Sequence, residues 1–301
     1  MASKVHLTFL GTVDQIPSRA RNHTSILLEF NDENILIDCG EGTQRQFRKV
    51  GLNPCKVTRI LITHWHGDHV LGIPGLLSTL ASSGYNKTLF IYGPKGTKEK
   101  IKKVLEVFNF YKSYEINVEE IGSGVFYSGK NFFLEAEDME HGIPALAYSF
   151  SETGNIRIDK EKLKKSGLPE GPLLQKLKEG KDVVHDGKKF KSKDLIYKEN
   201  DKKISVVLDT KINKNILPLI KNSDVFICEG TYSDELKKEA EEHLHMTVKQ
   251  AAEVAKKGKV KRLILTHVGG RHSKDMKGLL DEATSVFSET TIARDLDEVE
   301  I

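Results

Sequence analysis

The sequence has no long apolar run and few cysteines. No stretch of 18 or more apolar residues occurs, and the opening MASKVHLTFLGT lacks the continuous apolar block of a signal peptide. The three cysteines, Cys39, Cys55 and Cys228, lie far apart without C-x-x-C spacing, which argues against a disulfide framework and a cysteine zinc site. We therefore expect a cytoplasmic protein without a membrane-spanning segment.

Net charge is also small. The 46 Lys and Arg residues against 43 Asp and Glu residues give +3, too little for overall basicity to imply a polyanionic partner. Any nucleic-acid contact must therefore be local. The 301 residues, 38% of them hydrophobic, are enough to bury the core of one large domain or two small ones.

Short apolar runs between turn residues predict a mixed α/β protein in two halves. The expected strands are Val5–Leu10, Ser25–Phe30, Ile35–Asp38, Arg59–Thr63, Leu89–Tyr92, Tyr114–Ile121, Ala145–Phe150, Ile204–Leu208 and Arg262–Thr266. Helical spacing predicts helices over Thr97–Phe108, Ser233–Glu242, Val248–Lys257 and Met276–Val286.

The stretch 152–200 differs from the rest of the chain. It holds 13 Lys or Arg against 9 Asp or Glu, few large apolar residues and the turn-rich segment GLPEGP. This composition predicts an insertion outside the core. Taken alone it is equally typical of a solvated surface loop.

Three histidines and an aspartate crowd into six residues, from His64 to His69, directly after an apolar strand. Neutral imidazole nitrogens and carboxylate oxygens are the ligands zinc prefers when thiolates are absent. Alternation sends His64 and His66 the same way, whereas Asp68 and His69 lie further round the turn, so two adjacent ion sites are better served than one. The alternative is a surface turn rich in histidine.

Three further residues could complete such a site. His141 precedes the strand Ala145–Phe150, Asp209 follows Ile204–Leu208, and His267 follows Arg262–Thr266. Taken singly, each is more often a cap or a satisfied polar group. Together with the histidine cluster they form a recognisable set.

The set resembles the metallo-β-lactamase superfamily, whose H-x-H-x-D-H signature is formed here by His64, His66, Asp68 and His69. Within it the chain resembles the ribonuclease Z family of tRNA 3′-processing endonucleases. Pro17–Asn22 (PSRARN) is similar to the family's P-x-K-x-R-N loop, with Arg19 in place of Lys. The segments DCGEGTQRQ from Asp38 and HWHGDHVLGIPGLL from His64 also match the family.

The resemblance implies a metallo-β-lactamase αββα sandwich spanning 1–301, with two zinc ions per subunit. His64, His66 and His141 would hold one zinc, Asp68, His69 and His267 the other, and Asp209 would bridge both. Two such ions make hydroxide available near neutral pH and neutralise charge on phosphorus. Asp68 would also accept a proton from the nucleophile.

The resemblance implies that His245, in the segment His-Met-Thr247, gives a proton to the leaving 3′-oxygen. Thr247 and Gln250 have capping-box spacing, which would fix His245 at a helix N-terminus. Its acidic partner would be Glu229, although the family's H-E-A-T segment here is Cys-Glu-Gly-Thr. The alternative for Glu229 is a buried carboxylate that binds backbone amides. His243 is expected to be an exposed helix end.

Substrate contacts are expected at Arg271, Gly171 and Pro172. Arg271 falls on the family's Phe-Ser-x-Arg arginine within Val-Gly-Gly-Arg, and could clamp a phosphate or simply face solvent. Gly171 and Pro172 resemble the Gly-Pro turn of the family's flexible arm, or exosite, which 152–200 would form. Such an arm would bind tRNA through phosphates and ribose. In the family it serves the partner's active site, which implies a homodimer.

The resulting hypothesis is a zinc-dependent endoribonuclease that removes the 3′ trailer of precursor tRNA, leaving a 3′-hydroxyl on the tRNA and a 5′-phosphate on the trailer. One alternative is another hydrolase of the superfamily, such as a small phosphodiesterase, an arylsulfatase or a thioesterase; the arm and the PSRARN loop argue against it. The other is a catalytically silent RNA-binding subunit, against which seven intact ligands argue.

Overall fold

The structure is a computed structural model that describes residues 4–108, 113–154, 156–198 and 201–301. Residues 1–3 of the opening and residues 155, 199 and 200 of the expected insertion lie outside the described residues. The chain divides into two units. The first comprises Met1–Tyr127, Leu134–Phe150 and Lys203–Ile301, and the second Ser128–Phe133 and Ser151–Lys202.

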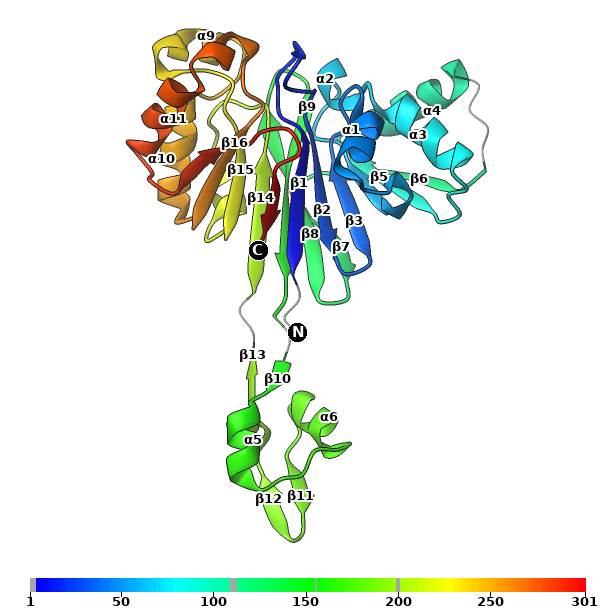
Figure 1. Ribbon diagram of the computed structural model, residues 1–301, viewed down its shortest axis with the longest axis vertical. Helices are drawn as coiled ribbons and strands as arrows, with labels where there is room; N and C mark the ends of the chain where they lie inside the picture. The colour runs from blue at the N-terminus through cyan, green and yellow to red at the C-terminus, as the bar shows by residue number, and fades with distance from the viewer. Residues whose placement is uncertain (1–3, 109–112, 155, 199–200) are drawn as a thin grey trace. The chain divides into compact units, whose positions relative to one another are not determined.

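The first unit contains two seven-stranded sheets (Figure 1). The first sheet has the order β18-β1-β2-β3-β4-β5-β6. Its strands are β1 (Val5–Gly11), β2 (Ser25–Phe30), β3 (Glu33–Ile37), β4 (Arg59–Leu61), β5 (Leu89–Gly93), β6 (Ile116–Glu120) and β18 (Glu298–Glu300). The strands from β3 to β6 pair in parallel, so their carboxyl ends lie at the same edge of the sheet. The polar residues that follow β4 begin at this edge.

The second sheet has the order β17-β16-β15-β14-β9-β8-β7. Its strands are β7 (Gly124–Gly129), β8 (Phe132–Glu140), β9 (Pro144–Glu152), β14 (Lys202–Val207), β15 (Val225–Glu229), β16 (Arg262–Thr266) and β17 (Thr290–Ile292). The strands from β14 to β17 pair in parallel, with Val207 opposite Cys228 and Cys228 opposite Leu265. The carboxyl ends of β14, β15 and β16 therefore meet at one edge.

Helices cover the outer face of each sheet (Figure 1). Beside the first sheet lie α1 (Thr43–Val50), α2 (Gly67–Val70), α3 (Ile73–Ser82) and α4 (Thr97–Val107), and beside the second lie α8 (Ile216–Ile220), α9 (Lys237–Glu242), α10 (Val248–Gly258) and α11 (Met276–Thr284). Short 3₁₀ turns span Pro54–Lys56, Asp234–Leu236 and Gly270–Lys274. The mixed α/β expectation is confirmed as a helix, sheet, sheet, helix layering.

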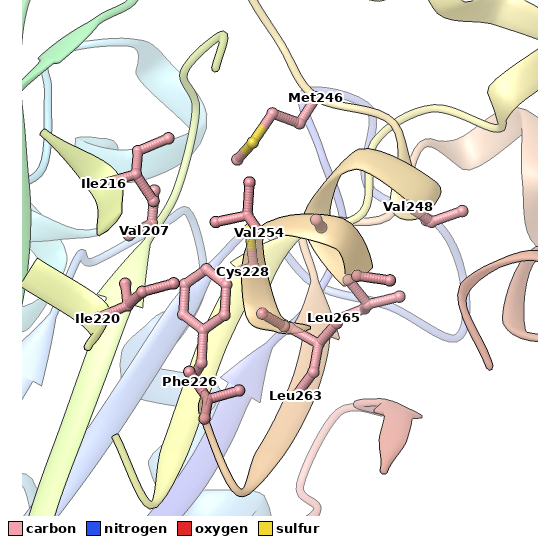
Figure 2. Close-up of a cluster of buried hydrophobic side chains, with 14 of the residues drawn as sticks. Val207, Ile216, Ile220, Phe226, Cys228, Met246, Val248, Val254, Leu263 and Leu265 are labelled. Carbon is pink, nitrogen blue, oxygen red and sulfur yellow. The ribbon is translucent and has the colours of Figure 1, made fainter. Parts of the chain in front are cut away.

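Each sheet shares an apolar core with its helices. In the second sheet, Phe226, Leu263 and Leu265 pack against Ile220 of α8 and Val254 of α10 (Figure 2). A comparable cluster joins the first sheet to α1 and α3. The inner faces of the two sheets are joined by the Tyr148 hydroxyl of β9, which donates to the carbonyl of Ile62 after β4 at 2.6 Å.

The second unit has a small core of its own. Its elements are β10 (Ile156–Ile158), α5 (Lys160–Ser166), α6 (Leu173–Lys178), β11 (Val183–His185), β12 (Lys188–Phe190), α7 (Ser192–Leu195) and β13 (Ile196–Lys198). Six buried side chains pack together: Leu163, Leu168, Leu177, Val183, Phe190 and Leu195. The insertion predicted from composition thus carries a packed interior, which its low content of large apolar residues did not indicate.

Among the described residues, no helix is long and apolar enough to cross a membrane.

Candidate active site

Seven residues expected to bind metal lie at strand ends or on short turns of the first unit. His64 follows β4, and His66 precedes α2, which carries Asp68 and His69. The other three sit at the ends of second-sheet strands: His141 follows β8, Asp209 lies just past β14, and His267 directly follows β16. The end of β4 in the first sheet and the ends of these second-sheet strands lie side by side. Residues up to about two hundred positions apart in the chain therefore come within contact distance.

His64, His66 and His141 form the first group of converging side chains, together with Asp209. His66 Nδ1 lies 3.0 Å from His64 Nε2 and 3.2 Å from His141 Nε2. Asp209 Oδ2 faces the same point, 3.7 Å from His64 Nε2 and 3.6 Å from His141 Nε2.

Asp68, His69 and His267 form the second group, again with Asp209. Asp68 Oδ2 lies 3.3 Å from Nε2 of both His69 and His267. The other oxygen of Asp209, Oδ1, lies 3.4 Å from His69 Nε2 and 3.3 Å from His267 Nε2. One carboxylate therefore presents an oxygen to each group.

Hydrogen bonding shows that these groups suit cations. Asp209 Oδ1 is buried and has no hydrogen-bond partner within the described part of the chain. The neighbouring Nε2 atoms of His69 and His267 lie only 3.2 Å apart, so their lone pairs would face each other and the carboxylate. A buried oxygen without a donor is costly, and a cation shared by these atoms would remove the conflict. The residues present therefore fit metal ions.

Four of the five histidines are held from behind through their other ring nitrogen. Asp38 Oδ2 lies 2.6 Å from His69 Nδ1, and the Thr63 hydroxyl lies 3.1 Å from His64 Nδ1. His267 Nδ1 lies 2.9 Å from the Thr231 hydroxyl, and His141 Nδ1 lies 3.2 Å from the Leu244 carbonyl oxygen. Each contact places the proton on Nδ1 and leaves the Nε2 lone pair facing the group, as in many metal sites. The sequence did not single out these supporting contacts.

His245, which is half-buried, and Glu229, which is fully buried, form a pair beside these groups. His245 Nδ1 lies 2.8 Å from Glu229 Oε2, and His245 Nε2 lies 4.0 Å from Asp209 Oδ2. Burial lowers the pKa of His245, but the charge and hydrogen bond of Glu229 outweigh this and raise the pKa to about 9. In the metal-free chain this pKa keeps His245 protonated at neutral pH.

The position of His245 is fixed by the residues that follow it in the chain and by Glu229. Met246 buries its side chain in the core of the second sheet (Figure 2), and Thr247 and Gln250 form the capping box that the sequence predicts. Glu229 is fully buried at the end of β15, where it also accepts hydrogen bonds from the Thr210 N–H and the Thr231 hydroxyl. The Glu229 carboxylate therefore does both things considered for it from the sequence: it binds a backbone amide, and it contacts His245.

The two groups open into a cavity of about 370 Å³. Its walls also contain residues that the sequence analysis did not assign to a site: Asp14, Gln15, Ile16, Thr231, Tyr232 and His243. His243 is exposed at the end of α9, as expected, yet it lines this cavity. A spacing of two residues from His245 was the signal available in the sequence.

Arg271 lines the same cavity but is already paired. Its guanidinium donates to Glu239 of α9 at 2.6 Å and lies 5.2 Å from the ring centre of Tyr232. A phosphate at Arg271 would therefore compete with a carboxylate. Gly171 and Pro172 belong to the second unit, at the turn before α6, and their role in binding stays a prediction.

Comparisons with known proteins give relatives over the whole chain. A ribonuclease Z from Listeria monocytogenes is 41% identical over 97% of this chain and 98% of the relative. The crystal structure of the short form of human tRNase Z has a TM-score of 0.72 at 26% identity, covering 98% of each chain. That of the metallo-β-lactamase fold protein YhfI from Bacillus subtilis has a TM-score of 0.72 at 19% identity, covering 99% of this chain and 100% of that one.

A family model described as anti-Pycsar protein Apyc1 matches residues 5–108, about a third of the chain. The relatives match nearly the full length instead, and the two-sheet architecture is shared with the solved structures. The two-sheet unit therefore has the metallo-β-lactamase fold, and the chain belongs to the ribonuclease Z family of metal-dependent hydrolases that cut RNA phosphodiester bonds.

Proposed function

We propose that this protein is a zinc-dependent endoribonuclease that removes the 3′ trailer from precursor tRNA, leaving a 3′-hydroxyl on the tRNA and a 5′-phosphate on the trailer. The observation that carries the proposal is that two metal-binding groups and the His245–Glu229 pair converge on one cavity. The curated relatives named ribonuclease Z supply the substrate class.

His64, His66 and His141 would hold one zinc, Asp68, His69 and His267 the other, and Asp209 would bind both. The two oxygens of Asp209 face different groups, which supports a bridging role. Bound zinc lowers the pKa of a water molecule and neutralises negative charge on a phosphate. Nitrogen and carboxylate ligands without thiolates are compatible with this metal.

Asp68 would orient the attacking water and accept its proton. Burial raises the pKa of Asp68, but His267 and His69 outweigh it and hold the pKa below its ordinary value. The group is therefore a carboxylate at neutral pH. It also lines the cavity, which gives it access to a water beside the scissile phosphate.

His245 would protonate the leaving oxygen, which is the 3′-oxygen of the tRNA. Its Nδ1 proton is held by Glu229, so the proton on Nε2 is the one directed at the cavity. A pKa raised by Glu229 keeps that proton in place until the bond to phosphorus breaks. Replacing His245 with Ala should slow cleavage by roughly 10²–10⁴-fold without loss of metal.

The segment 152–200, including Gly171 and Pro172, would bind tRNA, and Arg271 would contact a phosphate near the scissile bond. Thirteen basic residues in that segment support contacts to the RNA backbone. By the same family resemblance, the protein would act as a cytoplasmic homodimer in which each arm serves the partner's site.

The test is incubation of the purified protein with an unmodified precursor tRNA, followed by mapping of both product ends. Cleavage near the acceptor stem with a tRNA 3′-hydroxyl and a trailer 5′-phosphate is expected, and a chelator should abolish it. Hydrolysis of a small aryl phosphodiester without cleavage of precursor tRNA would instead favour the small-phosphodiesterase alternative. No hydrolysis of either substrate by the zinc-loaded protein would favour the silent RNA-binding subunit.

A further inference from the structure

A basic loop between β1 and β2, residues 14–22, forms one wall of the cavity. Asp14, Gln15 and Ile16 line the cavity, and Arg19 lies exposed further along the loop. Where the loop closes, the N–H groups of Thr12 and Val13 both donate to the carbonyl of Asn22, at 2.9 and 3.1 Å. The position of this wall therefore depends on what holds the base of the loop.

Asp295 binds the base of the loop from the far end of the chain. Its half-buried carboxylate accepts three hydrogen bonds: from the Thr12 hydroxyl at 2.7 Å, the Asn22 N–H at 2.7 Å and the Gln46 side-chain amide at 2.8 Å. The Arg21 guanidinium donates to the same Thr12 hydroxyl at 2.7 Å. A single carboxylate thus joins the C-terminal turn, both ends of the loop and α1.

The turn that carries Asp295 is held to β1 by backbone hydrogen bonds, and the Arg21 guanidinium of the loop also donates to the Ala293 carbonyl just before the turn, at 2.8 Å. The Leu296 N–H donates to the Phe9 carbonyl at 2.6 Å, and the Phe9 N–H donates to the Asp297 carbonyl at 3.0 Å. The Asp297 N–H closes the turn onto the Arg294 carbonyl at 3.1 Å. Since β1 fixes this turn through backbone bonds, the carboxylate is a fixed point against which the loop is placed.

Movement of the loop would reach a second part of the cavity wall. The Gly270 N–H donates to Asp14 Oδ2 at 3.4 Å, and the Asp14 N–H donates to the Val268 carbonyl at 3.4 Å. These contacts join the loop to the segment that carries Arg271. Two walls of the cavity are therefore linked to one anchor.

We propose that Asp295 is a positioning residue that places the 14–22 loop against the RNA substrate. It lies outside the cavity lining and contacts none of the proposed metal ligands, so its effect falls on substrate binding and alignment. The inference rests on the proposed function for its substrate, whereas the anchoring of the loop can be measured without RNA.

Two substitutions of Asp295 weaken the anchor of the loop to different degrees. Asp295→Asn keeps the shape of the side chain, and the amide oxygen can still accept from Asn22 and Gln46. The amide nitrogen then faces the Thr12 hydroxyl, which already accepts a hydrogen bond from Arg21. Asp295→Ala removes all three bonds. The matched control is Asp297→Asn in the same turn, whose carboxylate accepts the Arg294 N–H at 2.8 Å and makes none of the contacts to the loop described above.

Hydrogen–deuterium exchange on the zinc-loaded protein tests the anchor. Amides of the 14–22 loop should exchange about tenfold faster or more in Asp295→Ala, because local opening loses these hydrogen bonds. Asp295→Asn should lie between Asp295→Ala and the wild type. Amides of α10 and all of the Asp297→Asn protein should keep wild-type rates. Unchanged exchange of the loop in Asp295→Ala would overturn the proposal.

Kinetics test the consequence for the substrate. The KM for precursor tRNA should rise about tenfold or more in Asp295→Ala, since a small misplacement of a positioning element costs that much or more. Metal content and hydrolysis of bis(p-nitrophenyl) phosphate should stay close to wild type. An equal loss on both substrates, or an unchanged KM despite a loosened loop, would overturn substrate positioning. A wild-type protein that does not cleave precursor tRNA would refute the proposed function, and loop exchange would still decide the anchoring role.

Discussion

Glu229→Gln separates the charge of Glu229 from its shape. The glutamine side chain can keep the hydrogen bond from the Thr210 N–H at Oε1, which is 2.8 Å long in the wild type. Its amide group would replace Oε2, the atom that faces His245 Nδ1 at 2.8 Å. An amide donor at that position forces Nδ1 to accept. His245 therefore loses both the negative charge and the acceptor that stabilise its protonated form.

The size of the effect follows from the pKa of His245. Burial lowers this pKa, and Glu229 raises it to about 9, above its ordinary value of 6.5. Without the charge, burial should bring the pKa to 6.5 or lower, a difference of at least about 2.5, or about 3 kcal/mol in the protonation equilibrium. Bound cations beside Asp209 would lower the pKa in both proteins, so the difference between them is the quantity to measure.

The sign follows from the role as an acid. If His245 acts as the proposed acid, cleavage needs the protonated imidazole, and the wild-type rate should hold through neutral pH and fall as the pH rises through the pKa of His245. In Glu229→Gln this fall should begin near or below pH 6.5, and at one pH unit above its pKa only about a tenth of the acid form would remain.

Single-turnover cleavage of precursor tRNA across this pH range gives the profile directly. A diester with a nitrophenolate leaving group needs no acid, so its hydrolysis should change little in Glu229→Gln. Glu241→Gln, at an exposed position of α9 outside the cavity lining, should behave as wild type on both substrates. An unshifted alkaline limb in Glu229→Gln, or equal losses on the two substrates, would refute the acid role of the pair.

Three further outcomes are expected from changes elsewhere in the chain. Asp209→Ala should retain at most one metal ion by mass spectrometry, and two ions with unchanged cleavage would contradict the bridging assignment. Replacing 156–196 with a Gly/Ser linker should spare hydrolysis of an aryl phosphodiester but weaken precursor tRNA binding and flatten its salt dependence; unchanged affinity and slope would reduce the segment to a solvated loop. Glu239→Gln should free Arg271 and tighten RNA binding severalfold at low salt, and a weaker complex would show that the pair orders the wall.

The predicted elements agree best with the structure where apolar runs are bounded by turn residues. The strands at Ser25–Phe30 and Arg262–Thr266 have the predicted bounds, and the helix predicted over Thr97–Phe108 ends at Val107. The expected helix at Ser233–Glu242 begins instead with a 3₁₀ turn, Asp234–Leu236, before α9. Local pattern is sufficient for these elements because neighbouring residues in the chain determine them.

Elements whose exposed face is charged were harder to predict. β8 reads FFLEAEDME, in which acidic residues alternate with buried Phe132, Leu134 and Ala136, and the sequence analysis did not assign it as a strand. The core of the second unit was missed for a related reason. Its buried residues are spread through a segment rich in polar and charged residues, so only the folded chain shows that they meet.

The residues of the two candidate metal groups could be picked out from the sequence because their side-chain chemistry is visible there, whereas the groups that orient them could not. Two of these groups depend on backbone shape: Asp38 and Leu244 both adopt left-handed φ values, 55° and 58°. This conformation places the Asp38 carboxylate on His69 and the Leu244 carbonyl on His141, and it costs roughly 1–2 kcal/mol at a residue other than glycine.

That cost gives a final prediction at Leu244. Leu244→Gly should relieve the strain and raise the free energy of unfolding by about 0.5 kcal/mol, because glycine adopts positive φ freely but loses more entropy on folding. The carbonyl that orients His141 remains, so metal content should not change. Urea unfolding of the metal-depleted and zinc-loaded proteins measures both effects. A destabilised variant with weaker zinc binding would mean that the leucine side chain, and not only its carbonyl, holds His141 in place.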